Sequence, residues 1–295
     1  MTAARKTSLA CLALAVIWGT TWCAIRATIG DDGFPTMLAA ALRFTLATII
    51  LVPLALRARP WPRGVQWPWL VFAGVLNAVG YALIYFGEEE VPGGLAAVLF
   101  STQPLVMAGL LVATRMETVR RSDVAGAVVA MLGVVIIFAD KLAVSPGQAI
   151  GVVLVLASVI VSTLYSLVMK RHSGRIHPLA STTVFVGVTA VCLWLATAVA
   201  GHQSMPWPPP AIGTLALVYL AVAGTVIGFA AYFWLLARVS LLAANVVSFV
   251  VPVIALAVDA VFESVGLGPR AYIGVAVILG AVLIAQYRGR AATAA

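Results

Sequence analysis

Few residues in this sequence could do chemistry, and two of them are charged side chains within long apolar runs. Arg43 lies eight residues after Pro35, and Asp259 lies near the end of the apolar run 241–262. Since a helix rises about 1.5 Å per residue, a helix that begins at Pro35 would carry Arg43 about 12 Å along its axis, close to the middle of a bilayer. The planar guanidinium of Arg43 suits a carboxylate, and a structural tie to helix-end carbonyls or to Asp259 is the alternative. Asp259 could couple the protein to protons, or it could pair with Arg26 or Arg43.

Aromatic and amide side chains form the second group of candidates. Asn77 and Tyr81 are four residues apart and would share one face of a helix. Rings with a polar tip at mid-depth suit a site that accepts an apolar side chain and holds an amino group over a ring face, whereas packing is the alternative role. The candidate binding residues are Trp18, Arg43, Asn77, Tyr81, Gln103, Tyr165, Phe229, Asn245 and Ser248.

Two prolines interrupt apolar runs at corresponding places. Pro104 and Pro252 each remove one backbone hydrogen bond from a helix, which kinks it and frees a carbonyl group. Kinks at mid-depth in both runs predict hinges or bends that shape a site, and a static packing kink is the alternative.

The sequence lacks the patterns of enzymes and metal sites. No phosphate-binding loop, metal-ligand spacing of His and Cys, or Ser/His/Asp arrangement occurs at membrane depth. The acidic run Glu88–Glu90 is the one cluster that a membrane enzyme could use, but it precedes Pro92 and two glycines and is interpreted as a solvated outer turn. We therefore predict no catalytic residue, no metal, no cofactor and no nucleic-acid partner.

Composition decides which environment must hold these residues. Of the 295 residues 63% are hydrophobic, and only 9% are charged, where a soluble domain carries about a quarter. So few charged residues cannot provide the polar surface that a water-soluble protein of this length needs, so the lipid bilayer is the predicted partner. The net charge of +8 is then a guide to topology rather than to an anionic ligand.

Charged and Pro/Gly-rich breaks divide the chain into ten apolar runs, each close to the roughly 20 residues that cross a bilayer. With the N-terminus inside, most of the 18 Lys and Arg residues fall on the cytoplasmic side. Ten spans with both termini inside give this separation, whereas nine or eleven would scramble it. The sequence predicts spans at about 7–29, 35–56, 66–86, 93–114, 123–139, 149–169, 178–199, 211–236, 241–262 and 271–287.

The two halves of the chain repeat one another. The tripeptide Pro-Trp-Pro at 60–62 recurs at 206–208, and a similar offset places Pro104 on Pro252. Five spans per unit force the second copy to cross the membrane upside down, which is the architecture of secondary transporters. We predict an all-α membrane protein with a 5+5 inverted repeat, whose units are residues 1–143 and 147–295.

The motifs together resemble the EamA-type transporters of the drug/metabolite transporter superfamily. They are Trp18-Gly19-Thr20, the spacing from Pro35 to Arg43, Thr102-Gln103-Pro104, Glu117 ahead of Gly126 and Gly133, Pro252, and Glu263 ahead of Gly274 and Gly280. The second half departs from the first at Val186, which stands where the repeat would place a counterpart of Arg43. Within the superfamily the chain is most similar to YddG-type amino-acid exporters.

That resemblance implies a ten-helix protein of the bacterial inner membrane that exports small metabolites by alternating access. Its expected substrate is an amino acid, aromatic or otherwise apolar, and its oligomeric state is left open. The alternatives are an exchanger, or a drug or nucleotide-sugar transporter of the same fold, with a membrane-embedded enzyme as a more distant one. A nucleotide-sugar or sugar-phosphate substrate would require several cations at mid-depth, where only Arg43 qualifies.

Overall fold

The computed structural model describes residues 3–29, 33–138, 148–199, 204–262 and 269–291. Throughout these residues the regular secondary structure is helical, which confirms the predicted all-α class. The elements are α1 (Ala3–Ile29), α2 (Thr36–Leu56), α3 (Gln66–Glu90), α4 (Gly93–Phe100), α5 (Gln103–Thr114), α6 (Arg121–Phe138), α7 (Ala149–His172), α8 (Pro178–Val199), α9 (Ala211–Tyr219), the π-helix η3 (Leu220–Ile227), α10 (Gly228–Leu236), α11 (Leu241–Asn245), α12 (Val247–Phe262) and α13 (Pro269–Ala291).

These elements make ten rods that correspond to the ten predicted spans. Seven segments of the described chain are long and apolar enough to cross a membrane. They are α1, α2, α3, the pair α4 and α5, α7, α8, and the run from α9 to α10. The other three rods are α6, the pair α11 and α12, and α13.

Three of the predicted spans are not continuous α-helices. The span 93–114 breaks at Ser101 and Thr102, because Pro104 has no N–H to donate to the carbonyl of the preceding turn. At this break the hydroxyls of Ser101 and Thr102 donate to the carbonyls of Val98 and Leu99, at 2.5 and 2.7 Å, so both side chains are hydrogen-bonded to the preceding turn.

The corresponding break in the second half lies elsewhere. Helices α11 and α12 separate at Val246, and Pro252 lies inside α12. Pro104, in contrast, is the second residue of α5. The two prolines therefore do not occupy equivalent kinks, since one begins a helix and the other is embedded in one.

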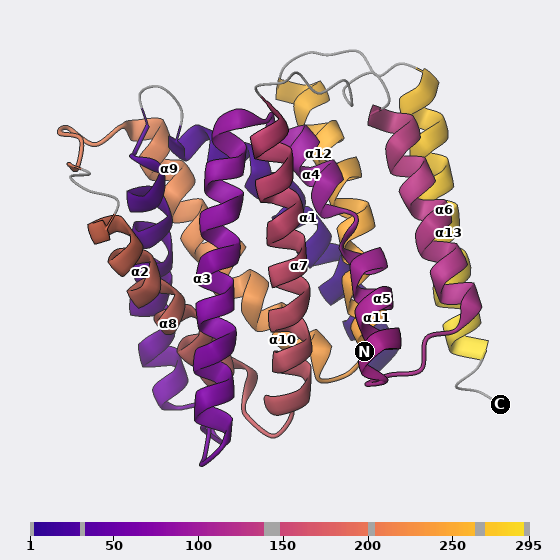
Figure 1. Cartoon of the computed structure of the whole chain (residues 1–295), viewed down its shortest axis with the longest axis horizontal. Coiled ribbons are helices and arrows are strands. Elements are labelled where there is room, and N and C mark those ends of the chain that lie inside the picture. The colour runs from indigo at the N-terminus through magenta and orange to yellow at the C-terminus, as the bar shows by residue number, and fades with distance from the viewer. Residues whose placement is uncertain (1–2, 30–32, 139–147, 200–203, 263–268, 292–295) are drawn as a thin grey trace.

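The rods pack as pairs around one large apolar core and a smaller one that lies between α4, α6, α12 and α13. Figure 1 shows α6 and α13 side by side at one edge of the bundle, α2 and α8 at the opposite edge, and α3 beside α7 between them. Glycines allow two of these pairs to approach closely. A Cβ on Gly133 would lie 2.9 Å from the carbonyl oxygen of Gly274, and one on Gly151 the same distance from that of Gly87.

Helix α1 begins and α13 ends at the same end of the bundle (Figure 1). Following the orientation that the charges predict, we call this the inner end, and we call the end at which α1 and α3 terminate the outer end. An even number of crossings requires this arrangement.

Helix α3 corrects one interpretation of the sequence. It continues through Glu90 instead of ending near residue 86, so the acidic run belongs to the helix. Glu88 is fully buried there, whereas Glu89 and Glu90 are exposed. The triplet is therefore not a solvated turn. Its middle and last residues face outward, while the helical period turns Glu88 toward the bundle.

Candidate functional site

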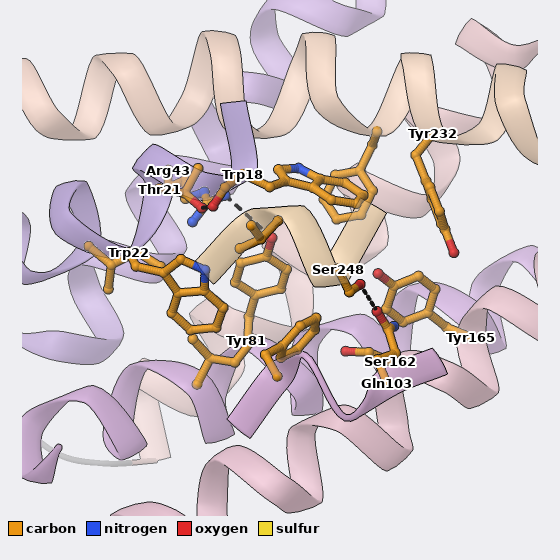
Figure 2. Close-up of a pocket in the computed structure, with 15 residues that line it drawn as sticks. Trp18, Thr21, Trp22, Arg43, Tyr81, Gln103, Ser162, Tyr165, Tyr232 and Ser248 are labelled. Carbon is orange, nitrogen blue, oxygen red and sulfur yellow. Dashed lines mark hydrogen bonds between the residues drawn. The ribbon is translucent and has the colours of Figure 1, made fainter. Parts of the chain in front are cut away.

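A cavity of about 60 Å³ lies among α1, α2, α3, α7, α10 and α12, next to the break between α4 and α5. Figure 2 shows that its side chains come from both halves of the chain and point toward a common space. The lining residues are Trp18, Thr21, Trp22, Ile25, Arg43, Tyr81, Ile84, Phe100, Gln103, Ser162, Tyr165, Phe229, Tyr232, Ser248 and Val251.

Arg43 is the one charged side chain among the described residues that line this cavity. It is 1% exposed, and hydroxyl groups surround its guanidinium. Nε donates to Thr225 Oγ1 at 2.9 Å, Nη2 to the Tyr81 hydroxyl at 3.3 Å and Nη1 to the Tyr85 hydroxyl at 3.5 Å. The acceptors of these three bonds are neutral and do not cancel the positive charge, so the site can attract an anion.

The π-helix η3 creates the space that holds Arg43. Thr225 Oγ1 donates to the carbonyl of Leu220, five residues earlier, at 2.9 Å while it accepts from Arg43. Gly224 faces the guanidinium, and a Cβ at this position would lie 3.1 Å from Arg43 Nη2. A π-helical segment within a longer helix is a frequent feature of functional sites, and here it brings a hydroxyl and a bare backbone to the charge.

Aromatic rings form the wall of the cavity. The Phe229 ring centroid lies 6.1 Å from that of Trp18, 6.3 Å from that of Tyr81 and 6.4 Å from that of Tyr165, each in an edge-to-face arrangement. Trp18 also approaches Tyr232, at 5.2 Å between centroids. The Trp18 ring fits because residue 228 is glycine, where a Cβ would lie 2.7 Å from the indole nitrogen. These faces and edges offer a surface against which an apolar or aromatic side chain can pack.

A second polar group lies apart from Arg43. Ser248 Oγ donates to Gln103 Oε1 at 2.9 Å, which joins α12 to the start of α5 (Figure 2). Tyr232 donates its hydroxyl to Ser166 Oγ, also at 2.9 Å. The cavity is thus cationic at Arg43, aromatic around Phe229 and neutral polar at Gln103.

Seven of the nine predicted binding residues meet in this cavity, and two do not. Asn77 is buried in α3, but its Nδ2 donates to Thr189 Oγ1 of α8 at 3.0 Å. Asn245 donates to the carbonyl of Leu241 within α11, at 2.7 Å. The side chain of Asp259 lies outside the described part of the structure. The residues that meet are Trp18, Arg43, Tyr81, Gln103, Tyr165, Phe229 and Ser248.

Several lining residues escaped the sequence reasoning. Trp22 and Ile25 follow Trp18 at intervals of four and seven residues, so a helical-face pattern could have found them. Tyr232 could have been chosen because it lies three residues after Phe229. Ser162 carries no signal that separates it from other small residues in α7.

Buried or partly buried carboxylates lie near both ends of the helix bundle. At the inner end, Glu117 Oε2 accepts from the backbone N–H of Leu241 at 2.9 Å, and Glu117 Oε1 lies 3.9 Å from Lys170 Nζ. Lys170 also donates to the carbonyls of Leu236 and Val239, at 2.6 Å each. At the outer end, Arg26 donates to the backbone carbonyl of Glu88.

Comparison with known proteins places the chain among membrane transporters. The sequence model of the EamA-like transporter family matches residues 5–139 and again residues 149–286. Protein PecM of Dickeya dadantii is 28% identical, covering 92% of this chain and 89% of its own length. The uncharacterized inner membrane transporter YedA of Escherichia coli K12 is also 28% identical, with 93% and 89% covered.

A probable terminal-alkyne amino-acid exporter of Streptantibioticus cattleyicolor is 27% identical, covering 92% of this chain and 91% of its own length. A crystal structure of another protein superposes with a TM-score of 0.76 at 21% identity, covering 96% of this chain and 97% of that one. The structural likeness concerns the fold alone. The double family match agrees with the predicted repetition of one five-helix unit.

Proposed function

This chain belongs to the EamA-like transporter family, and we propose that it exports amino acids, chiefly aromatic and other apolar ones. As a member of a transporter family it is not an enzyme. The finer assignment to YddG-type exporters is part of the proposal. It rests on the motifs in the sequence and on the chemistry of the cavity.

The observation that carries the proposal is the position of Arg43 beside a wall of aromatic rings. A substrate carboxylate would meet the guanidinium fork, whose present partners are neutral hydroxyls. An apolar side chain would lie against Phe229 and Trp18, and the ring faces of Tyr81 and Tyr165 would attract an amino group. A single amino-acid molecule carries all three groups that these contacts require: a carboxylate, an apolar side chain and an amino group.

The name of one relative supports the same substrate class. The Streptantibioticus cattleyicolor protein is named as an exporter of an amino acid, and it aligns with nearly the whole of this chain. An exchanger or another metabolite transporter of the same fold is the second candidate. A nucleotide sugar or sugar phosphate is less compatible, because among the described lining residues Arg43 alone would meet its phosphates.

We propose that the two units, 1–143 and 147–295, rock about this cavity in alternating access. Pro104 and Pro252 are the proposed hinges, and Asn77 and Asn245 are proposed substrate contacts in other states of the cycle. Asp259 is proposed as a coupling residue or an ion-pair partner. The protein would lie in the bacterial inner membrane with both termini in the cytoplasm, since most Lys and Arg residues then lie inside.

The test is flux of labelled amino acids across proteoliposomes that contain the purified protein. Phenylalanine and methionine should move faster than in protein-free vesicles, and glycine should not. Phe229→Leu should reduce the flux of phenylalanine, since it removes the central ring of the wall. The matched control is Phe86→Leu, because Phe86 is 39% exposed on the outside of α3. If none of the twenty amino acids moves faster than in protein-free vesicles, the proposal is wrong.

A further inference from the structure

The side chain of Glu88 has an unusual environment that the proposed substrate site does not explain. It is 0% exposed, and neither carboxylate oxygen has a hydrogen-bond partner among the described residues. A buried carboxylate normally accepts several hydrogen bonds, because the loss of hydration disfavours its charge. With none, the free energies of its charged and neutral forms depend on the cations nearby and on whether it holds a proton.

Two guanidinium groups act on this carboxylate. Arg26 of α1 and Arg43 of α2 both interact with it electrostatically. Arg26 is occupied by a hydrogen bond to the backbone carbonyl of Glu88, so it does not form a direct ion pair in the described contacts. On α3 itself, Tyr85 also lies within electrostatic range.

The residues that α7 and α4 present to this turn of α3 carry no charge. Helix α7 presents Gly151 and Val155 to Gly87, and neither titrates. Helix α4, from Gly93 to Phe100, contains no titratable residue. Glu89, on the same helix, is exposed and accepts a hydrogen bond from Thr36. Arg26 and Arg43 are therefore the cations that stabilise an ionised Glu88 in the described structure.

Arg43 connects Glu88 to the cavity. Tyr81, Ile84 and Glu88 lie on one face of α3 at successive turns, and the first two line the cavity. The Arg43 guanidinium donates to the hydroxyls of Tyr85 and Tyr81, about one and two turns before Glu88 on α3, and it also lines the cavity in which a substrate carboxylate is proposed to bind. Two negative groups that share one cation in a dry environment oppose each other, so the binding of one favours protonation of the other.

We propose that Glu88 is a proton-binding site, and that it takes up one proton when a substrate carboxylate binds Arg43. The proposal rests on the proposed function only in taking a carboxylate-bearing substrate. The proton comes from water and forms an O–H bond on a Glu88 oxygen, and no other bond changes. The proton leaves when the substrate does.

Such linkage has a definite sign. If binding takes up a proton, substrate affinity must rise as the pH falls through the range in which Glu88 titrates, by up to about tenfold per pH unit. Release is then favoured on the more alkaline side. An outward amino-acid gradient would drive export, and acid outside would slow it.

The test is calorimetric titration of the purified protein with phenylalanine in two buffers that differ in ionisation enthalpy. The difference gives the number of protons exchanged on binding. For the unchanged protein we expect an uptake that approaches one, and for Glu88→Gln an uptake near zero with affinity independent of pH. The matched control is Glu90→Gln, which makes the same substitution at an exposed position two residues away and should behave as the unchanged protein does.

The outcomes separate this inference from the proposed function. If phenylalanine binds and is transported but no proton is taken up, or if Glu88→Gln takes up as many protons as the unchanged protein, the proton site is wrong and the function stands. If no amino acid binds, the proposed function is wrong. The proton site is then tested by the same titration with another carboxylate that does bind. Should Glu88→Gln not fold, as its melting profile would reveal, the unchanged protein still tests the inference, because phenylalanine binding without proton uptake overturns it.

Discussion

The carboxylates of Glu117 and Glu88 lie at opposite ends of the bundle and differ in their exposure and in their hydrogen-bond partners. Glu117, at the inner end, is 21% exposed and has both a backbone N–H and the Lys170 ammonium as partners. Glu88, at the outer end, is fully buried and its oxygens have no partner among the described residues. The Glu117 carboxylate is thus held by two donors, whereas the charge of the Glu88 carboxylate is stabilised only by cations to which it makes no described hydrogen bond. The inner end thus holds helices together, and the outer end is suited to respond to the cavity.

The largest effect should come from removing the cation that Glu88 and the substrate are proposed to share. Arg43→Leu should lower amino-acid flux at least about tenfold, because loss of one partner of a desolvated ion pair costs about 2 kcal/mol or more. Arg43→Lys, which keeps the charge but loses the fork, should retain more flux than Arg43→Leu. Proteoliposome flux measures both. Unchanged flux in Arg43→Leu would assign the arginine a structural role only.

The structural role of the inner end should be seen in the stability that Lys170 provides. Its ammonium donates to the carbonyl of Leu236, the last residue of α10, and to that of Val239, which follows the helix. Lys170→Met should lower the free energy of unfolding by about 2 kcal/mol, since two part-buried acceptors lose a charged donor. The melting temperature in detergent gives the direction. Arg171→Met, at the exposed next position, is the matched control and should leave the melting temperature nearly unchanged.

A smaller effect is expected at Glu117. Glu117→Gln keeps an oxygen that can accept from Leu241 but removes the charge opposite Lys170, 3.9 Å away. Pairs with this exposure contribute about 0–1 kcal/mol, and salt screens them. The difference in melting temperature between this variant and the unchanged protein should therefore shrink as NaCl is added. A difference that salt does not alter would contradict an electrostatic origin.

The smallest effect on stability is expected at Glu88, although it is the more buried of the two residues. Glu88→Gln replaces a buried carboxylate that has no hydrogen-bond partner in the described structure by a neutral amide of the same shape, so it removes the cost of burying a charge and breaks no described hydrogen bond. Its melting temperature at neutral pH should equal or exceed that of the unchanged protein. A marked drop in the melting temperature would mean that Glu88 stabilises the fold, and the two ends would then not differ in this respect.

Much of the site could be predicted because the spacing of residues on one helix and the cost of burying a charged or polar side chain can both be judged from a single segment of sequence. Arg43 is singled out by charge within an apolar run, and Tyr81 and Phe229 by mid-depth rings in corresponding spans. Asn77 satisfied the same criteria, yet it faces Thr189 on α8 rather than the cavity. The spacing of residues within one helix gives a shared face, but not which neighbouring helix that face meets.

The sequence by itself determined the environment, the number of crossings and their duplication, because hydropathy, charge and repetition are properties of the chain that need no neighbours. Tertiary structure alone decided that Thr225 and Gly224, from the π-helix in the second half, surround an arginine from the first. It also decided that α3 runs on through the acidic triplet and buries one glutamate while its neighbours stay exposed. Burial and pairing depend on the groups that distant segments bring to a side chain, and those are fixed only when the helices pack.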